Sequence, residues 1–143
     1  MNTLSRRSLT LALLLAAAAA QADEARLVVT IKEIRDATGN LRISLYGDAD
    51  SFRKEDRALK VVSLPATKGE ARVTFDGIAP GRYALMAYHD ENADGKLNLR
   101  LGMFPTEGYA LSNNPRVMGP PKFADSAFDV TAPETEASLT LSY

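Results

Sequence analysis

An acidic loop carries the side chains whose spacing best suits chemistry in this sequence. Oxygen-bearing residues recur there at alternate positions, as Asp90-x-Asn92-x-Asp94, and a glycine follows them. Calcium binds several hard oxygens, and alternate residues of a tight loop can direct such oxygens to one point. We therefore predict a weak calcium site in this loop. Its ligands would be the side chains of Asp90, Asn92, Asp94 and Asn98 and the backbone carbonyl of Lys96.

The predicted ligand set is incomplete for a helix–loop–helix calcium site. Such a loop needs a bidentate Glu at its twelfth position, where this chain has Leu101. A carboxylate from elsewhere, Glu107 or Asp125, is a candidate to complete the shell. With two anionic ligands in the loop, we expect a dissociation constant on the order of 10⁻⁴ M. The alternative is a solvated turn, because Asp, Asn and Gly are also the preferred turn residues.

His89 is the single histidine of the chain and directly precedes the acidic loop. Beside a carboxylate it could act as a general base in a small hydrolase. With Met103 and Met118 it could supply soft ligands to copper. The alternative is a structural histidine at a strand end, and we favour it because no nucleophile is positioned by the sequence. We accordingly predict no catalytic residues and a protein that is not an enzyme.

A second group of polar and aromatic residues follows the loop. Tyr109, Asn113, Asn114 and Arg116 combine amides, a guanidinium and an aromatic face, which ligand grooves commonly use. We predict that these four residues bind a small-molecule, glycan or envelope-protein ligand. The alternative is that the two asparagines hydrogen-bond to the loop backbone.

Composition excludes several other classes of site. The 143 residues contain no cysteine, so disulfides, thiolate zinc sites and a cysteine nucleophile are ruled out. One histidine cannot build a multi-histidine metal site. Lysine and arginine do not cluster as a nucleic-acid footprint requires, so we predict no nucleic-acid partner.

The first 22 residues have the three parts of a signal peptide. Arg6 and Arg7 precede an apolar run, and Ala20-Gln21-Ala22 supplies a small-x-small cleavage pattern. We predict cleavage near Ala22 and a periplasmic or secreted protein without a transmembrane span, exported by the general secretory or the twin-arginine route. Cleavage removes two of the 17 basic residues and none of the 18 acidic ones, which leaves a net charge of −3.

The sequence pattern of residues 23–143 predicts a single all-β domain. Apolar and polar residues alternate with a period of two in several short runs, as in half-buried strands. We predict seven strands near 26–32, 41–46, 59–64, 71–75, 83–88, 128–130 and 137–143. The first two strands should form a hairpin, and a bulge would explain the slipped phase at Val61 and Val62. The polar stretch 48–57 could hold one helical turn that begins at Asp48 or Asp50.

Residues 99–123 interrupt this pattern. They contain seven glycines and prolines, which leave room for no more than short strand pieces, yet they also carry six apolar anchors. We therefore predict one long ordered loop that packs over an end of the sheet. The complete prediction is an antiparallel, seven-stranded Ig-like or prealbumin-like β-sandwich, with a small β-barrel as the alternative.

Two resemblances support this interpretation. Residues 73–85 (VTFDGIAPGRYAL) resemble the strand–turn–strand signature of prealbumin-like sandwich modules. The segments 88–97, 105–109, 112–114 and 119–123 (YHDENADGKL, PTEGY, SNN and GPPKF) together resemble an exported bacterial family called domain of unknown function 2141. That resemblance implies a secreted single β-domain and no activity. Asn98, where an aspartate is expected, and Pro115 depart from the family pattern.

From these observations we expect an exported, non-enzymatic β-sandwich that binds a ligand or assists another protein, with calcium stiffening the acidic loop. One alternative is a hydrolase that uses His89 with a nearby carboxylate. Another is a structural protein of the cell envelope that associates through its edge strands.

Overall fold

A computed structural model describes residues 23–143, so the predicted signal peptide lies outside the described residues. Ten strands, one 3-10 turn and one short helix make up this part of the chain. Their order is β1 (Ala25–Ile34), β2 (Asn40–Tyr46), η1 (Glu55–Arg57), β3 (Lys60–Pro65), β4 (Gly69–Ile78), β5 (Gly81–Asp90), β6 (Leu99–Arg100), β7 (Phe104–Pro105), β8 (Tyr109–Leu111), α1 (Phe123–Ser126), β9 (Phe128–Val130) and β10 (Glu134–Thr140).

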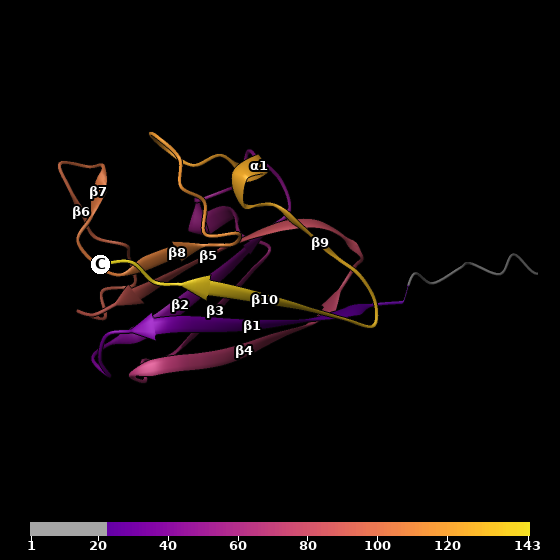
Figure 1. Ribbon diagram of the computed structural model, residues 1–143, viewed down its shortest axis with the longest axis horizontal. Coiled ribbons are helices and arrows are strands. Elements are labelled where there is room, and N and C mark those ends of the chain that lie inside the picture. Colours follow the sequence, from indigo (N-terminus) through magenta and orange to yellow (C-terminus); the bar gives the residue numbers. More distant parts are fainter. Residues whose placement is uncertain (1–22) are drawn as a thin grey trace, which may run out of the picture.

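The strands form two larger sheets and one small hairpin. The first sheet has the order β10-β1-β4, and the second has the order β3-β2-β5-β8, with β9 paired to the start of β5. The remaining pair, β6 and β7, forms a separate two-stranded hairpin. Figure 1 shows the two larger sheets packed against each other, with the hairpin standing away from them.

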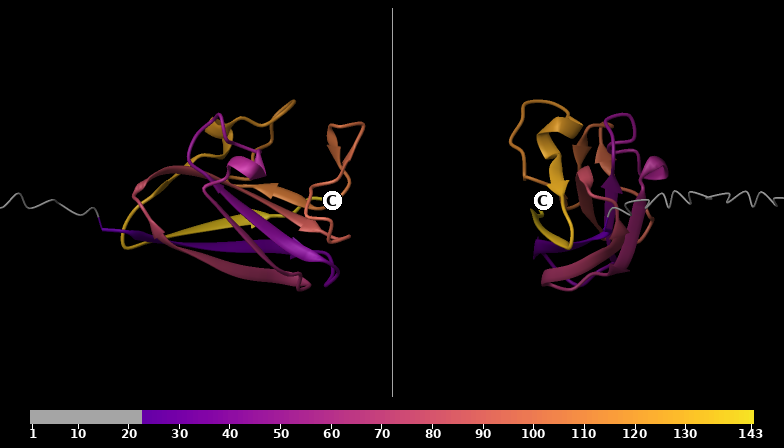
Figure 2. Two further views of the ribbon diagram at one scale, coloured as in Figure 1. Left: turned by 180° about the vertical axis from the view of Figure 1, so that it is seen from behind. Right: turned by 90° about the vertical axis from the view of Figure 1, so that its right-hand side faces the viewer.

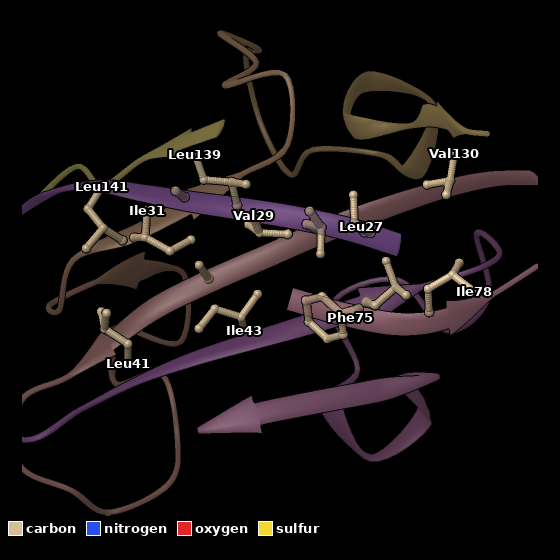
Figure 3. Packing of buried hydrophobic residues seen from close by; sticks show 14 of the residues in the cluster. Leu27, Val29, Ile31, Leu41, Ile43, Phe75, Ile78, Val130, Leu139 and Leu141 are labelled. Atoms are coloured by element: carbon tan, nitrogen blue, oxygen red, sulfur yellow. The ribbon is translucent and has the colours of Figure 1, made fainter. Parts of the chain in front are cut away.

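The core lies between the two sheets and follows from the alternation of the strands. Leu27, Val29 and Ile31 on β1 point inward and are almost completely buried, as are Leu41 and Ile43 on β2. Figure 3 shows these side chains meeting in one cluster, which residues from β4, β9 and β10 complete. Burial of this apolar surface is the main favourable contribution to folding.

The prediction of an all-β chain is confirmed, but that of seven strands in one sandwich is not. The additional strands β6, β7 and β8 come from segment 99–123, where prolines and glycines keep each strand to two or three residues. The strands are also not all antiparallel, because β1 pairs with β10 in parallel, from Arg26 opposite Glu134 to Lys32 opposite Thr140.

The predicted hairpin of the first two strands is wrong. β1 pairs with β4 and β10, whereas β2 pairs with β3 and β5, so the chain crosses from one sheet to the other between them. Alternation alone cannot distinguish the two arrangements, because both place the apolar face of each strand in the same core. Gly39 ends the crossing with a φ of 62°, and a Cβ there would lie 1.9 Å from the carbonyl oxygen of Asp90.

Two local predictions have different outcomes. The bulge at Val61 and Val62 is wrong, because β2 and β3 pair without a register shift. Val61 is simply exposed, while Val62 packs against the core. A helical turn within 48–57 is present as η1, but it begins at Glu55 after Lys54, so the predicted start at Asp48 or Asp50 is wrong. The Asp48 carboxylate instead accepts a hydrogen bond from the Ser51 backbone N–H at 2.8 Å.

Three connections gather on the outer face of the second sheet, the face that points away from the core. They are the 47–58 connection, the β6–β7 hairpin and the 113–122 loop, which Figures 1 and 2 show on the same side of the molecule. Phe52 of the 47–58 connection and Phe123, the first residue of α1, pack with their rings edge to face, with the ring centres 5.9 Å apart. Segment 99–123 therefore covers the outer face, where we had expected it over an end of the sheet.

Candidate functional site

The floor of the candidate site is the outer face of the second sheet. A solvent-facing surface of a sheet is usually polar, but here alternate positions of three neighbouring strands carry aromatic and apolar side chains. β5 contributes Met86 and Tyr88, and β8 places Leu111 and Tyr109 directly opposite them. Tyr46 at the end of β2 extends the same surface.

The three connections turn this surface into a pocket of about 810 Å³. Binding sites for small molecules commonly enclose about 300–1,000 Å³ and are largely apolar. The residues that line the walls come from the 47–58 connection, the end of the acidic loop, the β6–β7 hairpin and the 113–122 loop, and they are Arg53, Glu55, Gly95, Lys96, Leu97, Leu99, Gly102, Met103, Phe104, Pro105, Gly119, Pro120 and Pro121.

The polar groups at the pocket are mostly paired with one another. Glu55 forms an ion pair with Arg42, and the hydrogen bond to Glu55 raises the pKa of the guanidinium. Burial, followed by the negative charge of Glu55, raises the pKa of the Tyr88 phenol, which is therefore protonated at neutral pH. The Tyr88 hydroxyl donates to the Gly95 carbonyl at 3.1 Å. The pocket therefore offers an apolar interior, with the exposed cations Arg53 and Lys96 at its rim.

The acidic loop is held in shape by two buried carboxylates. Asp90 accepts hydrogen bonds from the backbone N–H groups of Asp94 and Gly95, at 3.0 and 2.9 Å. Glu107, which lies outside the loop, accepts from the N–H groups of Glu91 and Asn98, at 3.1 and 3.0 Å. Glu107 thus joins both ends of the loop, and each oxygen of this candidate calcium ligand accepts a backbone N–H.

The exposed side chains of the loop converge on Asp94. The amide nitrogens of Asn92 and Asn98 lie 3.3 and 2.9 Å from Asp94 Oδ2, and the Lys96 N–H donates to Oδ1. These hydrogen bonds, the one from Asn98 first, hold the pKa of Asp94 below its usual range. Within residues 23–143, no three His, Cys, Asp or Glu side chains form a metal-binding group. A cation here would therefore depend on amide and backbone oxygens beside Asp94.

His89 lies outside this pocket, and its Nδ1 lies 3.9 Å from the Glu91 carboxylate of the acidic loop. It is completely buried, and its Nε2 lies 2.7 Å from the Thr38 carbonyl oxygen, to which it must donate. Its Nδ1 lies 2.9 Å from the Tyr143 hydroxyl, whose oxygen accepts from the Arg35 N–H at 2.9 Å. The neutral Nε2–H tautomer satisfies all three bonds, so neither ring nitrogen is left for a substrate or for copper.

The predicted ligand residues separate into two groups. Tyr109 lines the pocket, and Arg116 is exposed on the 113–122 loop. Asn113 donates to the Ala127 carbonyl, while Asn114 donates to the Ser138 carbonyl and accepts from the Thr140 N–H. The two asparagines thus anchor the base of the 113–122 loop. This agrees with the alternative given above, in which they hydrogen-bond to the backbone and do not bind a ligand. Asp125 is likewise engaged locally, since it accepts from the Lys122 N–H at the start of α1.

Of the pocket floor, sequence reasoning identified Tyr109 but not Met86, Tyr88 or Leu111. A signal for the floor is present in β5, where Tyr83 to Tyr88 are apolar or aromatic at every position rather than at alternate ones. Such a run indicates a strand that is covered on both faces. Here the core covers one face, and the pocket with its connections covers the other.

The fold and site define a β-protein of two packed sheets with an apolar pocket on the outer face of one of them. The chain belongs to the family described as "Uncharacterized protein conserved in bacteria (DUF2141)", whose sequence profile matches residues 29–138. No curated protein and no solved structure matches the chain. None of the helices within residues 23–143 has the length and hydropathy to cross a bilayer.

Proposed function

We propose that this protein is an exported, non-enzymatic binding protein that holds a small apolar molecule in the pocket on the outer face of the second sheet. The observation that carries the proposal is the pocket itself, with its floor of Met86, Tyr88, Tyr109 and Leu111. Arg53 and Lys96 at the rim would face a polar or anionic end of the ligand. Export is supported by the signal-peptide pattern of residues 1–22.

The same proposal includes an Ig-like or prealbumin-like arrangement of the two larger sheets. Its support is the signature at 73–85, which forms the end of β4, a short turn and the start of β5. The absence of catalysis is proposed because His89, the single imidazole of the chain, has both ring nitrogens bonded in the core. Neither point bears on which apolar molecule is bound.

Binding of the uncharged fluorescent probe N-phenyl-1-naphthylamine tests the pocket. We expect one probe per protein, with a dissociation constant on the order of 1–10 μM for a ligand of this size. Met86 on the floor is half-buried and allows a matched pair of variants. Met86→Gln places an amide against the ligand and should weaken binding about tenfold, because apolar contact is lost at similar volume. Met86→Leu should change it less than about twofold.

Two results would overturn the proposal. One is the absence of saturable probe binding by the native protein. The other is equal affinity of the Met86→Gln and Met86→Leu variants, since a probe bound elsewhere on the surface would not distinguish them.

A second proposal concerns calcium. It is supported by the convergence of Asn92 and Asn98 on the exposed Asp94 carboxylate, since the Asn98 amide could present its oxygen to a cation after rotation by 180°. Because Gly95 and Lys96 of this loop also line the pocket, an ion there would stiffen one wall of it. Its test is argued below with Asp94.

A further inference from the structure

Two arms project beyond the rest of the molecule on the side of the pocket. The hairpin arm comprises residues 99–105, which include β6 and β7, and the loop arm comprises residues 115–122. Figure 1 shows both arms standing above the second sheet, and both views of Figure 2 show them on the same side. A single flat surface could therefore contact both tips at once.

The tips of both arms are apolar and exposed. Leu101 at the tip of the hairpin arm is 80% exposed, and Met118 on the loop arm is fully exposed. Met103, Phe104 and Val117 are also exposed large apolar residues on the arms. Neither Leu101 nor Met118 lines the pocket. Clustered apolar groups of this kind on a soluble surface usually mark an interaction site.

The hairpin turn places leucine where the backbone disfavours it. The Met103 N–H donates to the Arg100 carbonyl at 3.2 Å, and the two central residues Leu101 and Gly102 have φ values of 55° and 68°. Two positive φ values in succession favour Asn-Gly, because most side chains are strained there. A leucine at position 101 therefore strains the turn and exposes an apolar side chain to water. Because it does not stabilise the fold, its presence requires another explanation.

The charge of the arms is opposite to that of the whole chain. Arg100, Arg116 and Lys122 lie on the arms, and neither arm contains an aspartate or a glutamate. All three cations are exposed. Residues 23–143 as a whole carry a net charge of −3, because only two of the 17 basic residues and none of the 18 acidic ones precede them. Positive charge is therefore concentrated beside the apolar tips.

We propose that the two arms dock this protein onto an anionic lipid surface. Leu101 and Met118 enter the boundary between headgroups and acyl chains, while Arg100, Arg116 and Lys122 bind the lipid phosphates. Apolar side chains flanked by basic ones are what peripheral attachment to anionic lipid requires. A protein partner fits less well, since specific interfaces need an extended complementary surface and the arms present two separate convex tips. The inference does not depend on a ligand in the pocket.

Cosedimentation with lipid vesicles tests the docking surface. The native protein is mixed with vesicles of phosphatidylcholine alone or with about 30% phosphatidylglycerol, at low and at high salt. We expect binding to the anionic vesicles, little binding to the neutral ones, and weaker binding at high salt, where charges are screened.

Variants at the tips test the apolar contribution. Leu101→Asn combined with Met118→Gln should weaken vesicle binding at least about tenfold, because two apolar side chains no longer enter the lipid. The same protein should be as stable as the native one or more so, since the turn becomes Asn-Gly. Leu59→Asn is the matched control, because Leu59 is an exposed leucine outside both arms, and it should bind vesicles as the native protein does.

Charge variants complete the test. Arg100→Gln and Arg116→Gln should each weaken binding to anionic vesicles about fivefold. Arg72→Gln, at an exposed arginine of β4 in the other sheet, should leave binding unchanged. Absence of vesicle binding by the native protein overturns the inference, as does equal binding of the tip and Leu59→Asn variants. A dimer that the tip variants abolish, without any vesicle binding, would instead assign the arms to a second copy of the chain.

Failure of this inference and failure of the proposed function give different results. The tip variants should bind N-phenyl-1-naphthylamine with native affinity, because Leu101 and Met118 do not line the pocket. Conversely, Met86→Gln should bind vesicles normally, because Met86 lies on the pocket floor and not on either arm.

Discussion

Asp94 concentrates the chemistry of the acidic loop in one exposed carboxylate. The buried Asp90 and Glu107 each accept two backbone N–H groups, so their oxygens already have partners. Asp94 accepts one backbone N–H, from Lys96, at Oδ1, and its Oδ2 accepts from the side-chain amides of Asn92 and Asn98. Whether these side chains bind a cation or only one another can therefore be decided at this residue.

Calcium should raise the melting temperature of the native protein and not that of Asp94→Ala. With a dissociation constant on the order of 10⁻⁴ M, about 10 mM calcium should raise it by roughly 10 °C relative to chelator. Thermal melts of both proteins in calcium, magnesium and chelator measure this difference. If the carboxylate acts only through its internal hydrogen bonds, Asp94→Ala will lower the melting temperature equally with and without calcium, and the calcium proposal fails.

At the scale of elements, the β6–β7 hairpin depends on Glu107 for its position. This hairpin has only two paired residues on each strand, so its own pairing is weak. Glu107 holds its base, because its carboxylate accepts from N–H groups at the two ends of the acidic loop. The hairpin in turn supplies one wall of the pocket.

Glu107→Gln should destabilise the protein by about 1.5–3 kcal/mol, because one of the two N–H groups that donate to the carboxylate then faces an amide NH₂, which cannot accept from it. Amide hydrogen exchange should speed up most at Glu91 and Asn98. It should also speed up over the β6–β7 hairpin, which lies between Asn98 and Thr106. Glu136→Gln, at an exposed glutamate of β10, is the control and should leave both stability and exchange unchanged. A uniform increase in exchange over the whole chain would contradict a local role for Glu107.

Local patterns predicted the strands but not their partners. The alternation in β1, β2 and β4 placed these strands correctly, because one face of each is buried in the core. The pairing of β1 with β4 and β10 was not predictable, since a hairpin with β2 would bury the same side chains. The pocket as a whole was missed for a related reason, because its walls come from irregular segments that are far apart in the sequence, residues 53–55 and 95–121.

At the scale of the whole molecule, a chain of hydrogen bonds connects the two sheets at one end of the core. Arg35 and Thr38 belong to the crossing between the sheets, His89 lies on β5 of the second sheet, and Tyr143 follows β10 of the first. The Tyr143 hydroxyl accepts from the Arg35 N–H and contacts His89 Nδ1, while His89 Nε2 contacts the Thr38 carbonyl. Arg35 also lies over the Tyr143 ring, 4.4 Å from its centre.

Tyr143→Phe should therefore destabilise the protein by about 1–3 kcal/mol, measured by chemical denaturation. Loss of the hydroxyl leaves the buried His89 Nδ1 without a partner, and an unpaired buried polar atom costs its full desolvation. Tyr83→Phe is the matched control, since its hydroxyl donates to the Ala79 carbonyl at an exposed position and its loss should cost no more than about 1 kcal/mol. Equal losses of unfolding free energy in the two variants would contradict this prediction. They would mean that apolar packing alone holds the sheets together and that the Tyr143 hydroxyl adds nothing as a partner of His89.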